Sequence, residues 1–536
     1  MRIKEQNINK MLFWLLAISA LVRGVLAAWL EFGNDEVYYW TYALYPDWSH
    51  FDHPPMVGWM IQLFSLNLLF DSEFFIRLAS VVITTANTYI IYGIGKDIKD
   101  AQTGLYAALL YTASIYAFVI TGIFIMPDTP LMLFWLLAFW MAVIYFKRLP
   151  TERHSDSYII LFGMFAGLAM LSKYSGIFLW VGMMLYILIF DRKPLKTWAF
   201  YCALLISINL VLPILKWNIQ NDFISFNFHG ERVSLFGKPN FGTFFSELGG
   251  EFLYNNPVNF VLAVIALIAV FKKRINIEKP ALRLLLCTAF PLIIVFWVFS
   301  LTRPTLPHWN APAYILLILL TAYYLRKTHP NSSKLPKSIK AALWVMLLIV
   351  GLGAAEIKTG FIPLDRHTEP EMLGRDDFTV DMYGWQQLSE KFAAFREEKI
   401  AEGVMKPEDG IVANEWFPLA NLDYYVARPL GMRAMGIGWL GGLHKYLWIN
   451  EERGGFQLGE NYWFLTDSRY LKDPKELYQW YFESIELEET ITIERCGKPA
   501  KNFFVYTCKN LKTMPLTLDE LKAIAAASSA KTGSHQ

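Results

Sequence analysis

Apolar residues gather in eleven stretches along the chain, separated by shorter polar segments. A helix that crosses a bilayer needs about 20 predominantly apolar residues, with a range of about 17–25. The pattern predicts a polytopic α-helical membrane protein with about eleven transmembrane helices, at Met11–Leu30, Phe74–Gly95, Gly104–Phe124, Leu131–Phe146, Tyr158–Leu171, Ile177–Phe190, Trp198–Leu215, Val258–Phe271, Leu284–Leu301, Ala313–Leu325 and Ala341–Ile357.

Two of these stretches allow more than one interpretation. Tyr158–Phe190 is either one long span or two short ones, and the polar interruption Ser172-Lys173-Tyr174-Ser175-Gly176 favours two. Met11–Leu30 is long for a secretory signal, and no small-residue cleavage site precedes the acidic segment after it. We therefore expect the first helix to be retained.

Beyond residue 358 the long apolar runs give way to short alternating segments. Their spacing predicts strands and helices of a small α/β domain. The strands are expected at Gly410–Asn414, Tyr462–Leu465, Ile485–Arg495 and Phe503–Thr507, and the helices at Tyr383–Glu402 and Lys475–Phe482. We predict a transmembrane module over residues 1–358, an α/β domain over 359–510 and a tail over 511–536 whose end is disordered.

Charge is scarce and unevenly placed. Charged residues are 18% of the chain and the net charge is +2, so there is no overall basic field for nucleic acid. With a cytoplasmic N-terminus, the cytoplasmic loops hold 21 Lys and Arg and the opposite loops six. This bias predicts that orientation, and eleven crossings then place the C-terminal domain outside. There, Cys496 and Cys508 either form a disulfide or are two small core residues.

The first outside loop, Glu31–Ser72, is rich in acidic and aromatic residues. It contains Asn34-Asp35-Glu36 and later Asp52-His53-Pro54-Pro55, and it has no Lys or Arg between Gly33 and Glu73. Its aromatic residues suit helices that lie in the interface plane, where acids can meet a lipid head group. The alternative is an ordinary solvated acidic loop.

Asp128 is the only charged residue between Asp100 and Lys147. A carboxylate at the end of a span is costly unless it is paired, hydrated or used. Asp before Thr129-Pro130 is also a good helix start, so the alternatives for this carboxylate are a cap, a functional group or both.

Basic residues on the outside are few, so each is a candidate for binding a phosphate-bearing lipid. The candidates are Lys173 with its neighbour Tyr174, Arg232, Arg303 and His308. The alternative for each is a cation that snorkels to the interface, and we favour that alternative for Arg77.

Several segments together resemble one enzyme family. They are the Asn34–Trp59 loop with its acid pair and His-Pro-Pro, and Pro127-Asp128, Leu171-Ser172-Lys173-Tyr174, Trp217-Asn218-x-Gln220-Asn221-Asp222 and Tyr383-Gly384-Trp385. In this order they resemble the bacterial PMT_2/ArnT-like glycosyltransferases of the GT-C fold (glycosyltransferase families 39 and 83). These include lipid A aminoarabinose transferases and are related to protein O-mannosyltransferases.

The resemblance implies a sugar donor carried on a polyprenyl phosphate, an envelope acceptor such as lipid A, and inverting transfer on the periplasmic side of the bacterial inner membrane. Asp35 and Asp128 match the family's two key acids. His53 stands where aminoarabinose transferases have Lys, which puts that particular sugar or phosphate contact in doubt. Asp52 and His53 could also contact a divalent metal ion, and no other cofactor is indicated.

The chemistry of such a transfer fits these residues. A lipid phosphate leaves readily, so the reaction needs cations or donors for the phosphate and a carboxylate to take the acceptor's proton. Asp35 is our candidate base, and Asp128 or Glu36 would orient the acceptor or share that role. For an acceptor that is itself a phosphate, no base is needed and Asp35 would act electrostatically.

Two other functions remain open from the sequence. A lipid or solute transporter also needs many helices and intramembrane charge, although transporters usually place charged sites near the midplane. A protein O-mannosyltransferase of the same fold would differ only in its acceptor. The enzyme hypothesis expects Asp35, Asp128 and Lys173 to converge at one outer-surface cavity.

Overall fold

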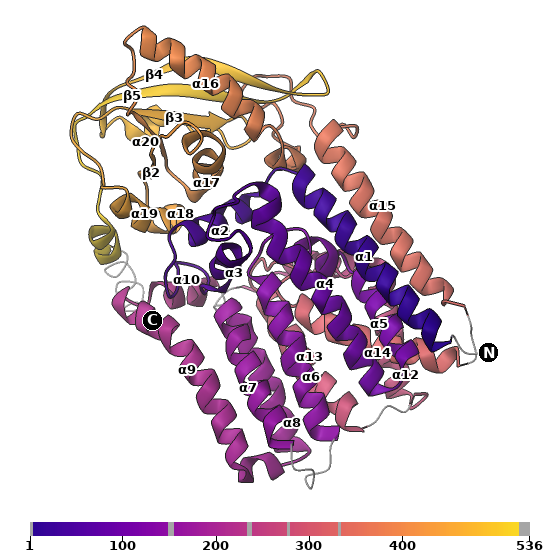
Figure 1. The fold of residues 1–536 in the computed structure, drawn as a ribbon. Coiled ribbons are helices and arrows are strands. Elements are labelled where there is room, and N and C mark those ends of the chain that lie inside the picture. Colours follow the sequence, from indigo (N-terminus) through magenta and orange to yellow (C-terminus); the bar gives the residue numbers. More distant parts are fainter. Residues whose placement is uncertain (1–3, 148–154, 233–237, 276–278, 331–333, 525–536) are drawn as a thin grey trace. The chain divides into compact units, whose positions relative to one another are not determined.

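The computed structural model describes residues 4–147, 155–232, 238–275, 279–330 and 334–524, which form two compact units (Figure 1). The first unit is Met1–Trp29 with Pro46–Val350, and the second is Leu30–Tyr45 with Gly351–Gln536. The first unit is helical, and the second combines helices with one sheet.

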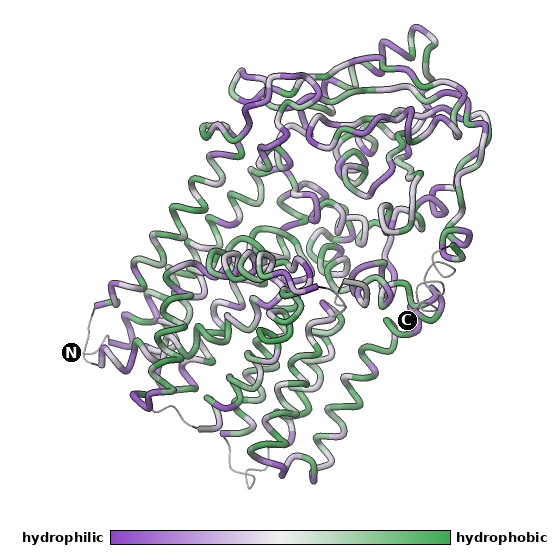
Figure 2. The backbone as a smooth tube through the Cα atoms, turned by 180° about the vertical axis from the view of Figure 1, so that it is seen from behind, coloured by the Kyte–Doolittle hydropathy of each residue, from purple (hydrophilic) through white to green (hydrophobic). Residues whose placement is uncertain are grey.

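The first unit holds fourteen α-helices of the described residues, among them the long apolar ones. They are α1 (Glu5–Trp29), α3 (Met56–Phe64), α4 (Glu73–Ile98), α5 (Ala101–Thr112), α6 (Asp128–Lys147), α7 (Ser155–Ser172), α8 (Phe178–Ile189), α9 (Trp198–Gln220), α10 (Ile224–Arg232), α11 (Phe241–Tyr254), α12 (Pro257–Phe271), α13 (Lys279–Ser300), α14 (Ala311–Thr328) and most of α15 (Lys337–Thr359). Short π or 3-10 turns lie at η1 (Tyr116–Ile120), η2 (Tyr174–Ile177) and η3 (Lys193–Lys196). Figure 2 shows that hydrophobic residues dominate these helices.

Ten of the eleven predicted stretches each lie mainly on one helix, and Gly104–Phe124 is divided between α5 and η1. In the described part of the chain, six helices are long and apolar enough to cross a membrane. The pair α11 and α12, bent by 103°, passes the same test as a broken span and brings the number to seven. The protein is therefore a multi-pass membrane protein, and the number of eleven crossings stays a prediction.

The interruption at Ser172–Gly176 separates α7 from α8, which confirms the two short helices predicted there. Gly176 is needed at this break, because a Cβ on it would come within 2.5 Å of the backbone of Ala169 and Met170. The predicted span Gly104–Phe124 is not one continuous helix. It breaks after Thr112, and the Ser114 hydroxyl accepts from the Ala117 N–H at the start of the following turn. Such side-chain bonds compete with a continuing helix.

The second unit is built on a five-stranded sheet with the order β2-β1-β3-β5-β4. Its strands are β1 (Gly410–Ala413), β2 (Ala434–Gly436), β3 (Tyr462–Asp467), β4 (Phe482–Arg495) and β5 (Lys498–Leu511). β1 runs parallel to β2 and β3, whereas β5 is antiparallel to β3 and β4. The four predicted strands are confirmed, and β2, which is three residues long, was not predicted.

Helices of the second unit are α2 (Asn34–Leu44), α16 (Trp385–Ala401), α17 (Trp416–Leu422), α18 (Leu440–Leu443), α19 (Tyr446–Glu452) and α20 (Pro474–Tyr478), with the turns η4 (Phe378–Met382) and η5 (Asp423–Ala427). The two predicted helices correspond to α16 and α20. Residues 518–524 are helical, and the predicted disorder at the end of the tail falls on 525–536, which lie outside the described residues.

The segment Leu30–Tyr45 belongs to the second unit, although it precedes nearly all of the first unit in the chain. The Glu31 carboxylate accepts a hydrogen bond from the Trp385 N–H at 2.8 Å, and the Tyr425 hydroxyl accepts one from the Phe32 N–H at 2.7 Å. Burial raises the pKa of Glu31. The sequence had assigned this segment to the transmembrane module.

The two cysteines of the second unit are not bonded to each other. Cys496 is exposed at the turn between β4 and β5, whereas Cys508 is fully buried and lies opposite Ile485. A disulfide needs Cα atoms within about 7 Å, but on the order of 30 Å of extended strand separates the two residues. The disulfide is therefore wrong, and only Cys508 is a core residue.

Candidate active site

A buried ion pair joins Asp128 and Lys173 in the first unit. Asp128 is the first residue of α6, and Lys173 directly follows α7, which packs beside α6. The Lys173 Nζ lies 2.8 Å from Asp128 Oδ2, and the Tyr116 hydroxyl donates to Oδ1 at 2.9 Å. The side chains of Asp128 and Lys173 are 1% and 10% exposed. Asp128 therefore starts a helix and also holds a cation.

His308 lies in the loop between α13 and α14, within electrostatic range of this pair. Burial lowers the pKa of His308 to about 4, helped by the positive charge of Lys173 and opposed by Asp128. The imidazole is consequently neutral at pH 7. It can donate one hydrogen bond to a phosphate, but it brings no positive charge.

His53 and Tyr174 meet at His229 of α10. The ring centroids of His53 and His229 are 5.9 Å apart, and those of Tyr174 and His229 are 5.1 Å apart. Burial lowers the pKa of His53 to about 3, and the charge of Asp52 opposes this effect. His53 is therefore also a neutral donor or acceptor at pH 7.

The possible metal site at Asp52 and His53 gains no third ligand from the residues that the structure describes. His229 uses a ring nitrogen to bond the Asp52 backbone carbonyl. Among the described residues, no further His, Cys, Asp or Glu atom joins Asp52 and His53 in a group close enough to hold an ion. A metal at this pair stays a prediction.

The three arginines predicted to lie outside differ in their surroundings and in how much of each the structure describes. Arg303 is half-buried just after α13, and its N–H donates to the Phe299 carbonyl at 3.0 Å. Arg232 ends α10, and its side chain lies outside the described part of the chain. Arg77 does not snorkel: it is fully buried, donates to the Ala27 carbonyl at 3.0 Å and lies over the Phe124 ring.

Asp35 and Glu36 begin α2 in the second unit, but their environments differ. Asp35 is exposed, whereas Glu36 is buried and its Oε2 accepts from the Gly33 N–H at 2.9 Å. This contact completes the first turn of α2. Glu36 thus has a structural role, which leaves Asp35 as the accessible carboxylate of the two. The shared cavity for Asp35 and Asp128 stays a prediction, because the two acids belong to different units.

Known proteins resemble this chain in sequence and in fold. Residues 52–217 match the PMT_2 family, described as dolichyl-phosphate-mannose-protein mannosyltransferase. The lipid A galacturonosyltransferase RgtD of Rhizobium johnstonii is 19% identical over 416 residues, which are 75% of this chain and 81% of that protein.

The crystal structure of ArnT from Cupriavidus metallidurans in the apo state matches with a TM-score of 0.61 at 13% identity, over 93% of this chain and 98% of that one. The same protein bound to undecaprenyl phosphate matches with a TM-score of 0.58 at 13% identity, over 92% and 97% of the two chains. The chain is a glycosyltransferase of the GT-C fold.

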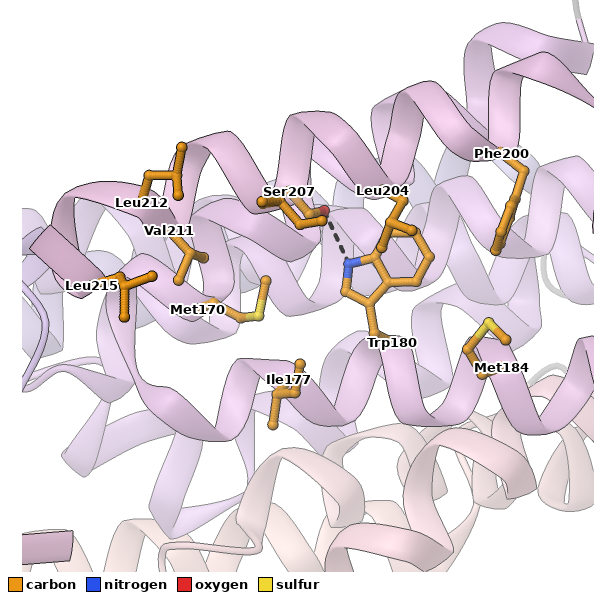
Figure 3. A pocket seen from close by; sticks show the side chains of 11 residues that line it. Met170, Ile177, Trp180, Met184, Phe200, Leu204, Ser207, Val211, Leu212 and Leu215 are labelled. Atoms are coloured by element: carbon orange, nitrogen blue, oxygen red, sulfur yellow. Dashed lines mark hydrogen bonds between the residues drawn. The ribbon is translucent and has the colours of Figure 1, made fainter. Parts of the chain in front are cut away.

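The glycosyltransferase has an apolar groove of about 530 Å³ between α7, α8 and α9 (Figure 3). Met170 and Ile177 line it and stand close to Lys173 in the chain. The Trp180 indole donates to the Ser207 hydroxyl at 2.9 Å across the groove. The remaining walls are apolar side chains, so the groove suits a hydrocarbon chain.

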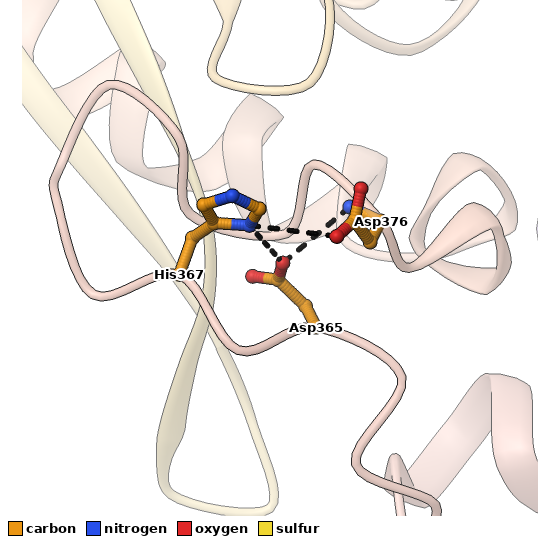
Figure 4. A group of neighbouring side chains, drawn as sticks. All are labelled: Asp365, His367 and Asp376. Atoms are coloured by element: carbon orange, nitrogen blue, oxygen red, sulfur yellow. Dashed lines mark hydrogen bonds and ion pairs between the residues drawn. The ribbon is translucent and has the colours of Figure 1, made fainter.

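Asp365, His367 and Asp376 form the one group of three potential metal ligands that the described residues contain (Figure 4). Asp365 accepts from the His367 Nδ1 at 2.8 Å and from the Gly374 N–H at 2.6 Å. The hydrogen bond to Asp365 raises the pKa of His367. This favours the protonated imidazole, which binds no metal, and the group therefore closes a loop of the second unit.

Proposed function

We propose that this enzyme moves a sugar from a polyprenyl-phosphate donor to lipid A or another envelope glycolipid, on the periplasmic side of the bacterial inner membrane. The buried Asp128–Lys173 pair is the observation that carries the proposal. It supplies a cation that is held in place beside neutral hydrogen-bonding groups. The likeness to a lipid A galacturonosyltransferase supports the acceptor class, and the likeness to ArnT bound to undecaprenyl phosphate supports the donor class.

Lys173 would bind the donor's phosphate. Its ammonium has three N–H groups, and the bond to Asp128 uses one of them. Two N–H groups can therefore point to phosphate oxygens while Asp128 fixes the direction of the side chain. His53 and His308 would donate neutral hydrogen bonds, and Tyr174, Arg232 and Arg303 are further candidates for the donor's head group.

Transfer then needs a nucleophile and a place for its proton. We propose that Asp35 takes the proton of an acceptor hydroxyl as the oxygen attacks the anomeric carbon. The bond from that carbon to the phosphate oxygen breaks, and the phosphate keeps the electron pair, so one displacement inverts the anomeric carbon. The apolar groove between α7, α8 and α9 would take part of the donor's prenyl chain.

Mass spectrometry of lipid A and of envelope proteins tests this function. Cells with the gene should carry a lipid A species heavier by one sugar residue, and cells with the gene deleted or with Asp35→Asn should lose it. Unchanged lipid A together with the loss of a hexose from periplasmic proteins would replace the lipid acceptor with a protein. No change in either pool would contradict glycosyl transfer to both acceptors.

A further inference from the structure

Two buried carboxylates lie on α11, outside the residues discussed so far. Glu247 and Glu251 are one helical turn apart on the same face and are 1% and 0% exposed. Within the described part of the chain, neither forms an ion pair. Two buried negative charges without a cation are costly, so their surroundings need an explanation.

Glu251 is fully occupied by neutral donors. The Trp297 indole donates to its two oxygens at 2.9 and 3.1 Å, and the Tyr314 hydroxyl donates at 2.7 Å. The Asn310 amide nitrogen donates as well. These donors come from α13, from the residue before α14 and from α14, so Glu251 ties three segments together.

Glu247 and Asn310 each leave one oxygen without a donor. Glu247 Oε2 accepts from the Thr305 hydroxyl at 2.8 Å, but Glu247 Oε1 is buried with no hydrogen-bond partner. Asn310 Oδ1 is also buried without one. The amide cannot be turned around, because its nitrogen donates to Glu251. Buried oxygens in native proteins are nearly always satisfied, so the site is short of positive partners.

We infer that Glu247 and Asn310, beside Glu251, form a binding site for a hard divalent cation such as Mg²⁺ or Ca²⁺. The available ligand atoms are carboxylate, amide and hydroxyl oxygens, which these ions prefer. No sulfur or imidazole nitrogen belongs to the set, which argues against zinc. The ion would bind Glu247 Oε1 and Asn310 Oδ1 and would balance the charge of both carboxylates.

The bound ion would fasten α11 to the loop that carries Arg303 and His308. Thr305 and Asn310 of this loop contact Glu247 and Glu251, and one turn further along α11 the Tyr254 ring lies 6.1 Å from the His308 ring. The site therefore supports the loop that carries two of the candidate phosphate ligands. It goes beyond glycosyl transfer and does not depend on the identity of donor or acceptor.

Metal binding to the full-length enzyme in detergent tests this inference without an activity assay. Protein stripped with EDTA is titrated with MgCl2 or CaCl2, while tryptophan fluorescence follows thermal unfolding and elemental analysis counts retained metal. We expect a saturable rise in Tm and about one equivalent of bound ion, the number one such site holds. Glu247→Gln, which keeps the shape but removes the charge, should abolish both. Asp365→Asn, in the other cluster, should keep both.

Two outcomes would overturn the inference. In the first, the ion causes no saturable rise in the Tm of the wild-type protein, and the Glu247→Gln variant is at least as stable as wild type. The glutamine would then mimic a Glu247 that carries a proton. The other is a Glu247→Gln variant with the wild-type shift. Asn310→Asp adds a ligating charge, so its metal-free Tm should fall and its ion-induced rise should exceed that of wild type. A smaller rise would contradict the site.

Discussion

The Asp128–Lys173 pair combines a structural and a chemical role in two side chains. Removing one partner of a buried pair typically costs about 3–5 kcal/mol, because the other charge stays buried alone. Lys173→Ala and Asp128→Asn should therefore each lower the Tm of the enzyme in detergent. The double variant Lys173→Gln/Asp128→Asn should recover most of the stability but not the transfer.

Kinetics separate the two roles of Lys173. Loss of a charged hydrogen bond to the donor's phosphate should cost about 1.5–3 kcal/mol, or about ten- to a hundredfold in kcat/KM. Arg303→Ala should also weaken donor use. Arg192→Ala, an exposed arginine at η3, is a better control than the buried Arg77. A stable double variant with normal kcat/KM would exclude Lys173 as a phosphate ligand.

Asp35 carries the proposed proton transfer. Asp35→Asn keeps the size of the side chain and removes its basicity, so transfer should fall at least about a hundredfold, the lower limit for a general base. Membrane insertion should not change. Asp71→Asn in the same loop serves as the control, and transfer by Asp35→Asn within a few-fold of wild type would reject the base role.

The neutral imidazoles predict how stability depends on pH. Burial lowers the pKa of His53 to about 3, below the value of about 6.5 expected in the unfolded chain. Below pH 6.5 the unfolded chain therefore binds the proton more readily, and stability falls as the pH drops toward 3. At pH 5 the loss from this group is at most about 2 kcal/mol.

His53→Asn should reduce the drop in Tm between pH 7.5 and pH 5, whereas substitution of the exposed His329 should not. An equal drop in wild type and His53→Asn would show that His53 does not cause it.

Among single residues, the sequence predicted isolated charges better than their partners. Asp128 and Lys173 were identified because charges are rare in these stretches. Tyr116 and the Glu247–Glu251 pair were missed, because a tyrosine or an acid in a helix carries no sign of the side chains that fold against it. Arg77 was misinterpreted for the same reason, since its partners come from α1 and from the segment before α6.

At the scale of elements, long apolar runs and polar interruptions were sufficient for most helices. The break at Ser172–Gly176 follows from a local cluster of polar and small residues. The break after Thr112 does not, because it occurs in a sequence that is apolar on both sides. The short strand β2 depends on pairing with β1 rather than on its own pattern.

The β4–β5 hairpin makes a prediction about its cysteines. A membrane-impermeant maleimide should label Cys496, which is exposed, and should label Cys508 only after denaturation. Reducing agent should not change the Tm, because there is no disulfide between them. Cys496→Ser is the control for labelling specificity, and a band shift on reduction of wild type that this variant lacks would contradict the free thiols.

At the scale of the whole molecule, the uneven distribution of Lys and Arg predicts the orientation. An alkaline phosphatase fused after Gly360, just beyond α15, should be active, because this enzyme folds only outside the cytoplasm. A fusion within the loop at Lys193–Lys196 should be inactive. The reverse result would move the C-terminal domain to the cytoplasm and remove the basis for periplasmic transfer.

Membership of Leu30–Tyr45 in the second unit has a consequence for how the protein is made. The ribosome finishes this segment early, but its partners around Trp385 and Tyr425 follow 354 and 393 residues later, which at about 5–20 residues/s is about 20–80 s. During this time the aromatic side chains of α2 are without their permanent neighbours. Nascent chains are therefore open to proteases at this segment, and completion of the second unit must await the end of synthesis.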